Sequence, residues 1–180
     1  LQADPSLLPD IDLAVARLLK ATRSGEAIGV FGAFDCDGVT SAAVLALALE
    51  GLGGRIVPYI PDRVSEGHGL NVAALESLRQ AGCRLIVTSD CGVSNVAEVA
   101  QAVSMGLDVI ITDHHTVPPS LPPALAVVNP RRTDSRYPPS DLASVGVSYK
   151  VAQALYRAAG QPEREDLLDL VAVGTIADLS

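Results

Sequence analysis

The stretch IGVFGAFDCDGVTSAAVLALALEGLGG, residues 28–54, decides the fold because it predicts one complete strand–turn–helix unit. Its first seven residues form a short apolar run typical of a buried strand, and the tetrapeptide DCDG follows at once. Residues 39–54 are apolar almost throughout and close on glycine, which predicts a buried helix. A strand that leads directly into a helix is the repeating unit of an α/β fold.

The same alternation continues on both sides of this unit. Further strands are predicted at residues 55–60, 84–90 and 107–113, and helices at residues 10–23, 70–82, 93–106, 141–159 and 163–178. Pro58 predicts that the second strand lies at an edge of the sheet or carries a bulge. A Pro-rich stretch, 117–139, contains one short apolar segment, ALAVVN at 124–129. We therefore expect an α/β fold with a doubly wound, mainly parallel sheet of about five strands and helices on both faces.

The length and composition of the chain exclude several classes of protein. The length of 180 residues favours one domain, residues 1–180, and 48% of the residues are hydrophobic. No apolar run approaches the roughly 20 residues of a membrane helix, so we expect no membrane association. Three cysteines without a C-x-x-C pair predict a reducing, cytoplasmic location. A net charge of −8 with 3% aromatic residues argues against a module that only binds single strands, and favours an enzyme that brings cations to phosphates.

Acidic residues follow three of the predicted strands. These strands end in Asp35-Cys36-Asp37-Gly38, in Ser89-Asp90-Cys91-Gly92 and in Asp113-His114-His115. Because parallel strands present their carboxyl ends at one edge of the sheet, four carboxylates and two imidazoles are expected to converge there. Their repulsion requires a neutralising cation, and a pair of divalent metals suits carboxylate and imidazole ligands. Gly38 and Gly92 are expected to let the backbone turn sharply after the ligands.

Two other interpretations apply to these turns. Asp37, which precedes GVTS, also fits a simple helix N-cap. Cys36 and Cys91 stand beside the acids and fit a zinc thiolate site, but adjacent strand residues point to opposite faces. We therefore expect both cysteines to be small residues of the core.

The motifs resemble those of the DHH phosphoesterase superfamily. DCDG at 35–38, SDCG at 89–92, DHH at 113–115 and GTIAD at 174–178 are similar to four of its signature motifs, in the same order. Four flanking segments resemble the RecJ-like branch of the superfamily: PDRVSEGHGLN (61–71), IVTSDCGVSN (86–95), VIITDHHTVPPSLPPALAVVNPRR (109–132) and LASVGVSYKVAQAL (142–155). DHH alone is a weak signal, whereas four ordered motifs with these flanks are specific.

The resemblance implies a site for two ions of Mn²⁺ or Mg²⁺. It implies that Asp90 bridges both ions and that Asp35 binds one of them. Asp37, His114 and Asp178 are implied to bind the other. Asp113 and His115 are implied to support these ligands, and the expected catalytic group is Asp90, Asp113, His114 and His115. Water activated between the metals is then expected to attack phosphorus.

Basic residues are the candidates for contact with substrate. The resemblance makes Arg63 and His68 candidates for a substrate phosphate, although Arg63 also fits a solvated loop charge. Arg131, with Arg132 and Arg136, forms the one basic cluster, which either contacts phosphate or balances local acids.

Three positions depart from the pattern that the resemblance implies. Phe31 stands where much of the superfamily has histidine, Ala33 stands where RecJ-like chains carry a further aspartate, and Ser144 replaces an expected glycine. The loss of an oxygen ligand at residue 33 is expected to weaken one metal or to alter the preference between manganese and magnesium. The resemblance implies a second, substrate-gripping domain in related nucleases, which we expect to be absent from residues 1–180.

Three functions compete. The first is a RecJ-like 5′-to-3′ exonuclease core that hydrolyses single-stranded DNA in repair or recombination, with repair proteins as partners through regions outside this chain. The second is a phosphodiesterase for short oligonucleotides or cyclic dinucleotides, or a pyrophosphatase, which the low basic content favours. The third is a degenerate module without catalysis, for which Phe31 and Ala33 argue. Retention of Asp90, His114 and Asp178 argues against the third.

Overall fold

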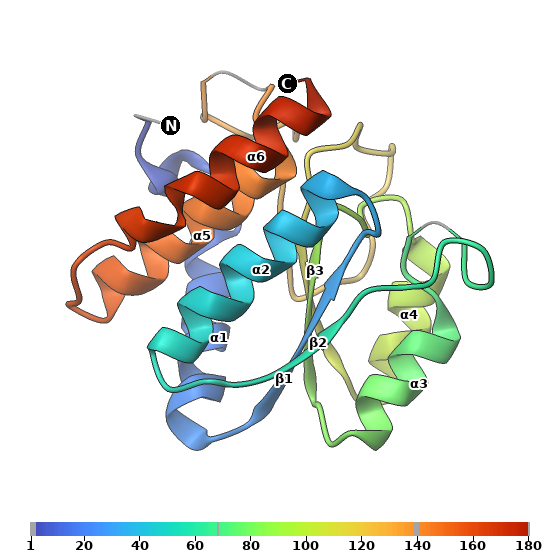
Figure 1. Ribbon diagram of the computed structural model, residues 1–180. Coiled ribbons are helices and arrows are strands. Elements are labelled where there is room, and N and C mark those ends of the chain that lie inside the picture. Colours follow the sequence, from blue (N-terminus) through green and yellow to red (C-terminus); the bar gives the residue numbers. More distant parts are fainter. Residues whose placement is uncertain (1–2, 68, 139–140, 180) are drawn as a thin grey trace.

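The computed structural model describes residues 3–67, 69–138 and 141–179. Its centre is a five-stranded parallel sheet with the strand order β2-β1-β3-β4-β5 (Figure 1). The strands are β1 (Ala27–Gly32), β2 (Arg55–Tyr59), β3 (Leu85–Ser89), β4 (Asp108–Thr112) and β5 (Ala126–Val128). The expected α/β fold is confirmed, and the segment ALAVVN supplies the fifth strand.

Helices cover both faces of the sheet. On one side lie α1 (Ile11–Ser24), α2 (Cys36–Gly51) and α5 (Ser144–Ala158), with α6 (Leu168–Asp178) packed over α2 and α5. On the other side lie α3 (Val72–Gln80) and α4 (Val96–Ser104). Short 3-10 turns occur at Pro5–Leu7 and Glu165–Leu167. Within the described part of the chain, no helix combines the length and the apolar character needed to cross a membrane.

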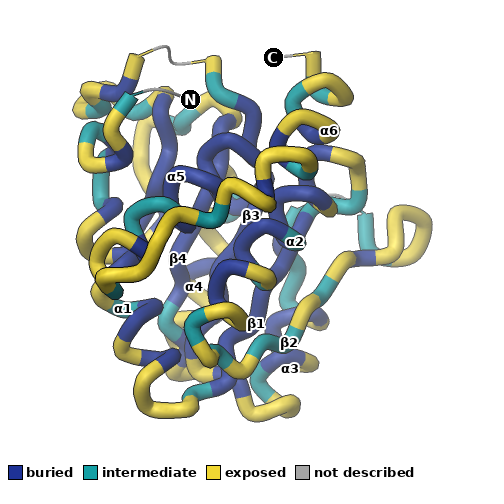
Figure 2. Tube along the Cα trace, turned by 60° about the vertical axis from the view of Figure 1, so that its left-hand side comes forward, coloured by how far each residue is buried: buried dark blue, intermediate teal, exposed yellow. Residues whose placement is uncertain are grey.

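Alternating strand residues build the two halves of the core. Ile28, Val30 and Val87 belong to the cluster under α1, α2 and α5, whereas Phe31 and Ile86 belong to the cluster under α3 and α4. This division follows from the two-residue period of a strand. The central strands are buried on both faces (Figure 2), which is why their sequences are apolar without interruption.

The two edges of the sheet are closed in different ways. At one edge, β2 pairs only with β1, so the edge position predicted from Pro58 is confirmed. At the other edge, the Val127 amide donates to Asp10 Oδ2 over 3.0 Å and the Val127 carbonyl accepts from Arg132 Nη1 over 2.7 Å. Arg132 also pairs with Asp134 at 2.7 Å. Arg132 therefore balances local acids and, together with Asp10, pairs the free backbone groups of the edge strand β5.

Gly174 allows α6 to approach α2 and α5 closely. A methyl group at residue 174 would collide with the hydroxyl of Thr40 and would lie 2.9 Å from Cγ1 of Val145. We expect Gly174→Ala to lower the free energy of unfolding by about 1–3 kcal/mol, because overpacking outweighs the gain in helix propensity. Urea unfolding measures this change, and adding Thr40→Ala should recover part of the loss by making room. A neutral or stabilising Gly174→Ala would contradict this tight packing.

Candidate metal centre

The predicted site residues lie where the strand order reverses. The sheet runs from β1 towards β2 on one side and from β1 towards β3 on the other, so a crevice opens at the carboxyl ends of β1 and β3. The turns after β1, β3 and β4 carry the acids and histidines, and the carboxyl end of α6 adds one more acid. The residues brought together are Asp35, Asp37, Asp90, Asp113, His114, His115 and Asp178.

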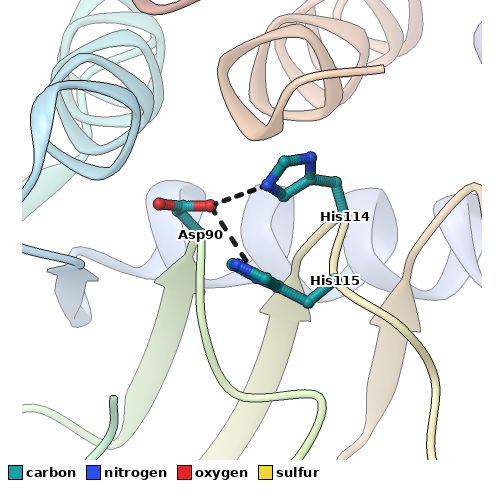
Figure 3. A group of neighbouring side chains, drawn as sticks. All are labelled: Asp90, His114 and His115. Atoms are coloured by element: carbon teal, nitrogen blue, oxygen red, sulfur yellow. Dashed lines mark ion pairs between the residues drawn. The ribbon is translucent and has the colours of Figure 1, made fainter. Parts of the chain in front are cut away.

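The imidazole of His114 lies at the centre of this cluster. Its Nε2 is 3.3 Å from Asp90 Oδ1 and 3.8 Å from Asp37 Oδ2, and its Nδ1 is 3.9 Å from Asp178 Oδ2. Two sets of ligand atoms result, each within 4.8 Å of one another: Asp90 with His114 and His115, and Asp37 with His114 and Asp178. Figure 3 shows both imidazoles directed at the Asp90 carboxylate. His114 is thus common to both sets, whereas the resemblance implied that Asp90 is the shared ligand.

Asp90 is held in an unusual position for a carboxylate. Its backbone has φ of 62°, in the left-handed region that non-glycine residues seldom adopt, and its side chain is only 3% exposed. Burial raises its pKa to about 7, and the charges of Asp37 and Asp35 contribute to the rise. Among the described residues, Asp90 Oδ1 and His114 Nδ1 are buried without a well-aligned hydrogen bond. Buried, unsatisfied ligand atoms in an acidic pocket fit a divalent cation.

Asp37 is oriented by another helix. Its Oδ2 accepts from the Ser144 amide and its Oδ1 from the Val145 amide, both over 2.8 Å. These amides are the first of α5, where a helix presents free donors and positive potential. Burial raises the pKa of Asp37, and the two backbone hydrogen bonds oppose that rise.

Asp35 is the N-cap of α2, since its Oδ1 accepts from the Gly38 amide over 2.9 Å. The alternative in which Asp37 caps the helix is therefore wrong. Asp35 is exposed and belongs to neither set of ligand atoms, although its charge contributes to the pKa of Asp90. Its carboxylate is thus near the site without contacting the two sets.

Asp113 orients the DHH turn. Its Oδ1 accepts from the His114 amide at 2.8 Å and from the His115 amide at 3.1 Å, and it lies 2.7 Å from His115 Nδ1. Its Oδ2 accepts from the Val93 amide at 3.0 Å, so the carboxylate joins the turns after β3 and β4. Asp113 thus holds the backbone of the DHH turn and the His115 imidazole through hydrogen bonds. Although burial opposes ionisation, these hydrogen bonds lower the pKa of Asp113.

In the metal-free chain, His115 forms an ion pair with Asp113. The hydrogen bond to Asp113 raises the pKa of His115 from 6.5 to about 9. The pair therefore stabilises the fold fully below pH 6.5 and loses its effect as the pH rises through 9. We expect Asp113→Asn to return the His115 pKa towards 6.5, as measured by NMR titration of the imidazole Cε1–H. An unchanged value near 9 would show that Asp113 is not the cause.

A cleft of about 340 Å³ opens beside Asp90 and His115. Its walls are Ala33, Phe34, Asp35, Gly69, Asp90, Cys91, Gly92, Val93, Ser94, Asn95, Asp113 and His115. The guanidinium of Arg63 lies 5.1 Å from the centre of the Phe34 ring, so this arginine stands at the edge of the cleft. His68 lies outside the described residues.

Arg131 is not part of this cleft. It lies 3.3 Å from the exposed Asp141 and lines a separate hollow of about 610 Å³ beside Thr116 and Asp134. The structure thus brings Arg63, but not Arg131, to the edge of the metal centre.

The two cysteines of the motifs differ. Cys91 is buried, as expected for a small residue of the core, and burial raises the pKa of its thiol well above the usual value. Cys36 is exposed, so its expected place in the core is wrong. The reason is that residue 36 already belongs to the first turn of α2, where strand alternation does not apply.

The structure shows where the three residues that depart from the expected pattern, Phe31, Ala33 and Ser144, are located. Phe31 is fully buried and stacks on Tyr59 with ring centres 5.6 Å apart, so it serves the core. Ala33 lines the cleft at the position of the missing acid. Ser144 is fully buried and its amide binds Asp37, while its hydroxyl has no hydrogen-bond partner among the described residues.

Sequence reasoning missed the backbone donors of α5 and the cleft residue Asn95. Asn95 accepts from the Leu70 amide at 3.4 Å and donates to the Leu70 carbonyl at 3.3 Å. Its position within IVTSDCGVSN was the only signal, because its partner is 25 residues away. The amide donors to Asp37 leave no trace in residue type at all.

The fold is a doubly wound α/β domain, and buried carboxylates and imidazoles gather where its strand order reverses. These two features place the chain among metal-binding α/β domains. The family follows from comparison. This chain belongs to the DHH family, whose N-terminal domain model matches residues 27–175.

Individual relatives share more than the fold. Single-stranded-DNA-specific exonuclease RecJ of Bacillus subtilis is 43% identical over 176 residues, covering 98% of this chain and 22% of that protein. A crystal structure of exonuclease RecJ bound to manganese superimposes with a TM-score of 0.85 at 37% identity, covering 96% of this chain and 44% of that one. RecJ in complex with Mg²⁺ from Thermus thermophilus superimposes with a TM-score of 0.65 at 30% identity, covering 96% and 21%. The chain therefore spans about a fifth of the length of the Bacillus relative.

Proposed function

We propose that this chain is the metal-dependent catalytic core of a single-strand-specific DNA exonuclease that cleaves from 5′ to 3′. The observation that carries the proposal is the pair of adjoining ligand sets, one built on Asp90 and the other on Asp37 and Asp178. Such an arrangement fits two divalent ions side by side, and relatives named RecJ have been crystallised with Mn²⁺ and with Mg²⁺.

The side chains of the site have distinct proposed roles. Asp37, His114 and Asp178 would hold one ion, Asp90 and Asp35 would hold the other, and Asp90 is the proposed ligand common to both. Bound metals supply an activated water and neutralise charge on the phosphate oxygens. Asp113 keeps His115 and the His114 backbone in place, while the amides of α5 fix the direction of Asp37.

The substrate occupies the open side of the site. Arg63 meets a phosphate at the edge of the cleft, and the cleft volume of about 340 Å³ suits one nucleotide next to Asp90. Arg131 is a candidate for a more distant phosphate, since it lies in another hollow. We further propose a cytoplasmic protein of DNA repair or recombination whose protein partners bind regions outside this chain.

Metal titration followed by a nuclease assay tests the proposal. Calorimetry with Mn²⁺ on the metal-free chain should show two ions per chain, and a 5′-phosphorylated single strand should then lose nucleotides from its 5′ end. Chelation with EDTA should stop cleavage and added Mn²⁺ should restore it. Binding of one ion or none would contradict the two-metal site and would favour the degenerate module, with Ala33 as the cause.

A small-nucleotide phosphodiesterase is the second candidate. The net charge of −8 and the one-nucleotide size of the cleft favour short substrates over long strands. Equal amounts of a dinucleotide and a long single strand, offered together, separate the two functions. Preferential hydrolysis of the dinucleotide would overturn the exonuclease proposal.

A further inference from the structure

The segment between β2 and α3 is organised around one carboxylate, that of Glu66. Its Oε2 accepts from the Tyr59 hydroxyl at 2.8 Å and from Asn71 Nδ2 at 3.2 Å. Its Oε1 accepts from the Asp62 amide at 3.0 Å. Tyr59 ends β2 and Asn71 is the N-cap of α3, so Glu66 ties the segment to both flanking elements.

Asp62 gives the same segment a tight turn. Its Oδ1 accepts from the amides of Val64 and Ser65 at 3.1 and 2.9 Å, and from the Ser65 hydroxyl at 2.8 Å. The residue between Asp62 and Val64 is Arg63. Its backbone is therefore held from the Asp62 side by this turn and, through the Asp62 amide, by Glu66.

Apart from these bonds and one backbone bond, from the Glu66 amide to the Asp62 carbonyl over 2.9 Å, little holds this turn in place. Residues 62–65 are exposed, and Val64 is 93% exposed, so the turn adds almost nothing to the hydrophobic core. Tyr59, by contrast, is anchored because its ring stacks on the fully buried Phe31. The hydroxyl of Tyr59 thus offers Glu66 a rigid point of attachment. Loss of the Glu66 carboxylate would release the turn without removing core contacts.

The geometry points to Glu66 as a positioning residue that places the Arg63 guanidinium over Phe34, at the edge of the cleft beside Asp90. Arg63 has a long, flexible side chain, and fixing its backbone lowers the entropy lost when it meets a phosphate. The role in substrate binding rests on the proposed function, whereas the placement of Arg63 over Phe34 is a property of the free protein.

An NMR experiment on the DNA-free chain tests the placement. In the wild type, the ring current of Phe34 should shift the Arg63 side-chain protons upfield, and Phe34→Leu should abolish that shift. We expect Glu66→Gln to remove most of it, because one amide oxygen cannot accept all three hydrogen bonds. Glu76→Gln is the matched control, since Glu76 is a half-buried glutamate on α3 that contacts Arg79 at 3.0 Å. A shift that persists in Glu66→Gln would overturn the inference.

Binding measurements test whether the placement serves phosphate recognition. With Ca²⁺ in place of a catalytic metal, fluorescence anisotropy gives the Kd for a 5′-phosphorylated oligothymidylate. We expect Glu66→Gln and Arg63→Ala each to weaken binding by about ten-fold, and the double variant to be no weaker than Arg63→Ala. Additive losses would mean that Glu66 acts independently of Arg63 and would overturn the inference. If the NMR result holds but the wild type does not bind the oligonucleotide, the proposed substrate fails while the placement of Arg63 stands.

Discussion

Asp90→Asn is expected to abolish high-affinity Mn²⁺ binding and to lower the rate of phosphodiester hydrolysis by about a thousand-fold or more. Asn has nearly the shape of Asp and tolerates the positive φ of 62° at this position, so the fold should survive. The substitution removes the negative charge of a carboxylate that lies 3.3 Å from His114 Nε2. No other described acid belongs to the ligand set of Asp90, His114 and His115.

The same substitution should stabilise the metal-free protein. Burial raises the pKa of Asp90 from 3.8 to about 7, so the folded state binds a proton between these values that the unfolded state releases. Stability due to this group is therefore lost as the pH rises from 3.8 to 7, because ionised Asp90 is buried without compensation. At pH 8 without metal, the Tm of Asp90→Asn should exceed that of the wild type.

Thermal unfolding with and without Mn²⁺ checks both statements. The wild type should gain stability on adding the metal, whereas Asp90→Asn should not respond. Asp12→Asn serves as the control, because Asp12 is an exposed acid on α1 outside both ligand sets. An undiminished response to Mn²⁺ in Asp90→Asn would place the metal elsewhere.

Gly38→Ala is expected to have the largest effect on the fold of the site. A methyl group at residue 38 would lie 2.5 Å from the carbonyl oxygen of Ala33 and 2.6 Å from its carbonyl carbon. Both atoms belong to the backbone and cannot rotate away, so the turn that carries Asp35 and Asp37 must shift. We expect a loss of about 3 kcal/mol in the free energy of unfolding, at the upper end for overpacking.

Urea unfolding and Mn²⁺ titration together measure this effect. Val39→Ala is the matched control, because Val39 is the next residue of α2 and is 42% exposed. The control should change stability by less than about 0.5 kcal/mol. Normal stability with normal metal binding in Gly38→Ala would contradict the close contact between Gly38 and Ala33.

The role of Gly38 also shows where sequence reasoning was incomplete. The motif DCDG predicted that Gly38 and Gly92 let the chain turn. Gly92 does so, with φ of 113°, whereas Gly38 lies in the first turn of α2 and is needed for the close approach of Ala33. A motif shows that glycine is required, but it does not show whether the reason is a positive φ or the absence of a Cβ atom at a close contact.

The sequence by itself determined the order of strands and helices, the parallel sheet and the turns that carry the site. Apolar runs of strand length alternate with amphipathic or apolar helices, and three of these runs end in a short acidic motif, so local pattern and global fold agree. Because parallel strands end at a common edge, the sequence pattern alone places Asp37, Asp90 and His114 together.

Only the tertiary structure decided how these ligands are held. The amides of α5 bind Asp37 across 107 and 108 residues of sequence, and α6 brings Asp178 to His114 because Gly174 permits close packing. The exposure of Cys36 follows from its place in the first turn of α2, and the bond from the Asp62 amide to Glu66 is local to one loop. The separation of Arg131 from the cleft, by contrast, depends on contacts between elements. Residue type and local period carry no record of such contacts, since backbone donors and packing distances are set by how the helices meet.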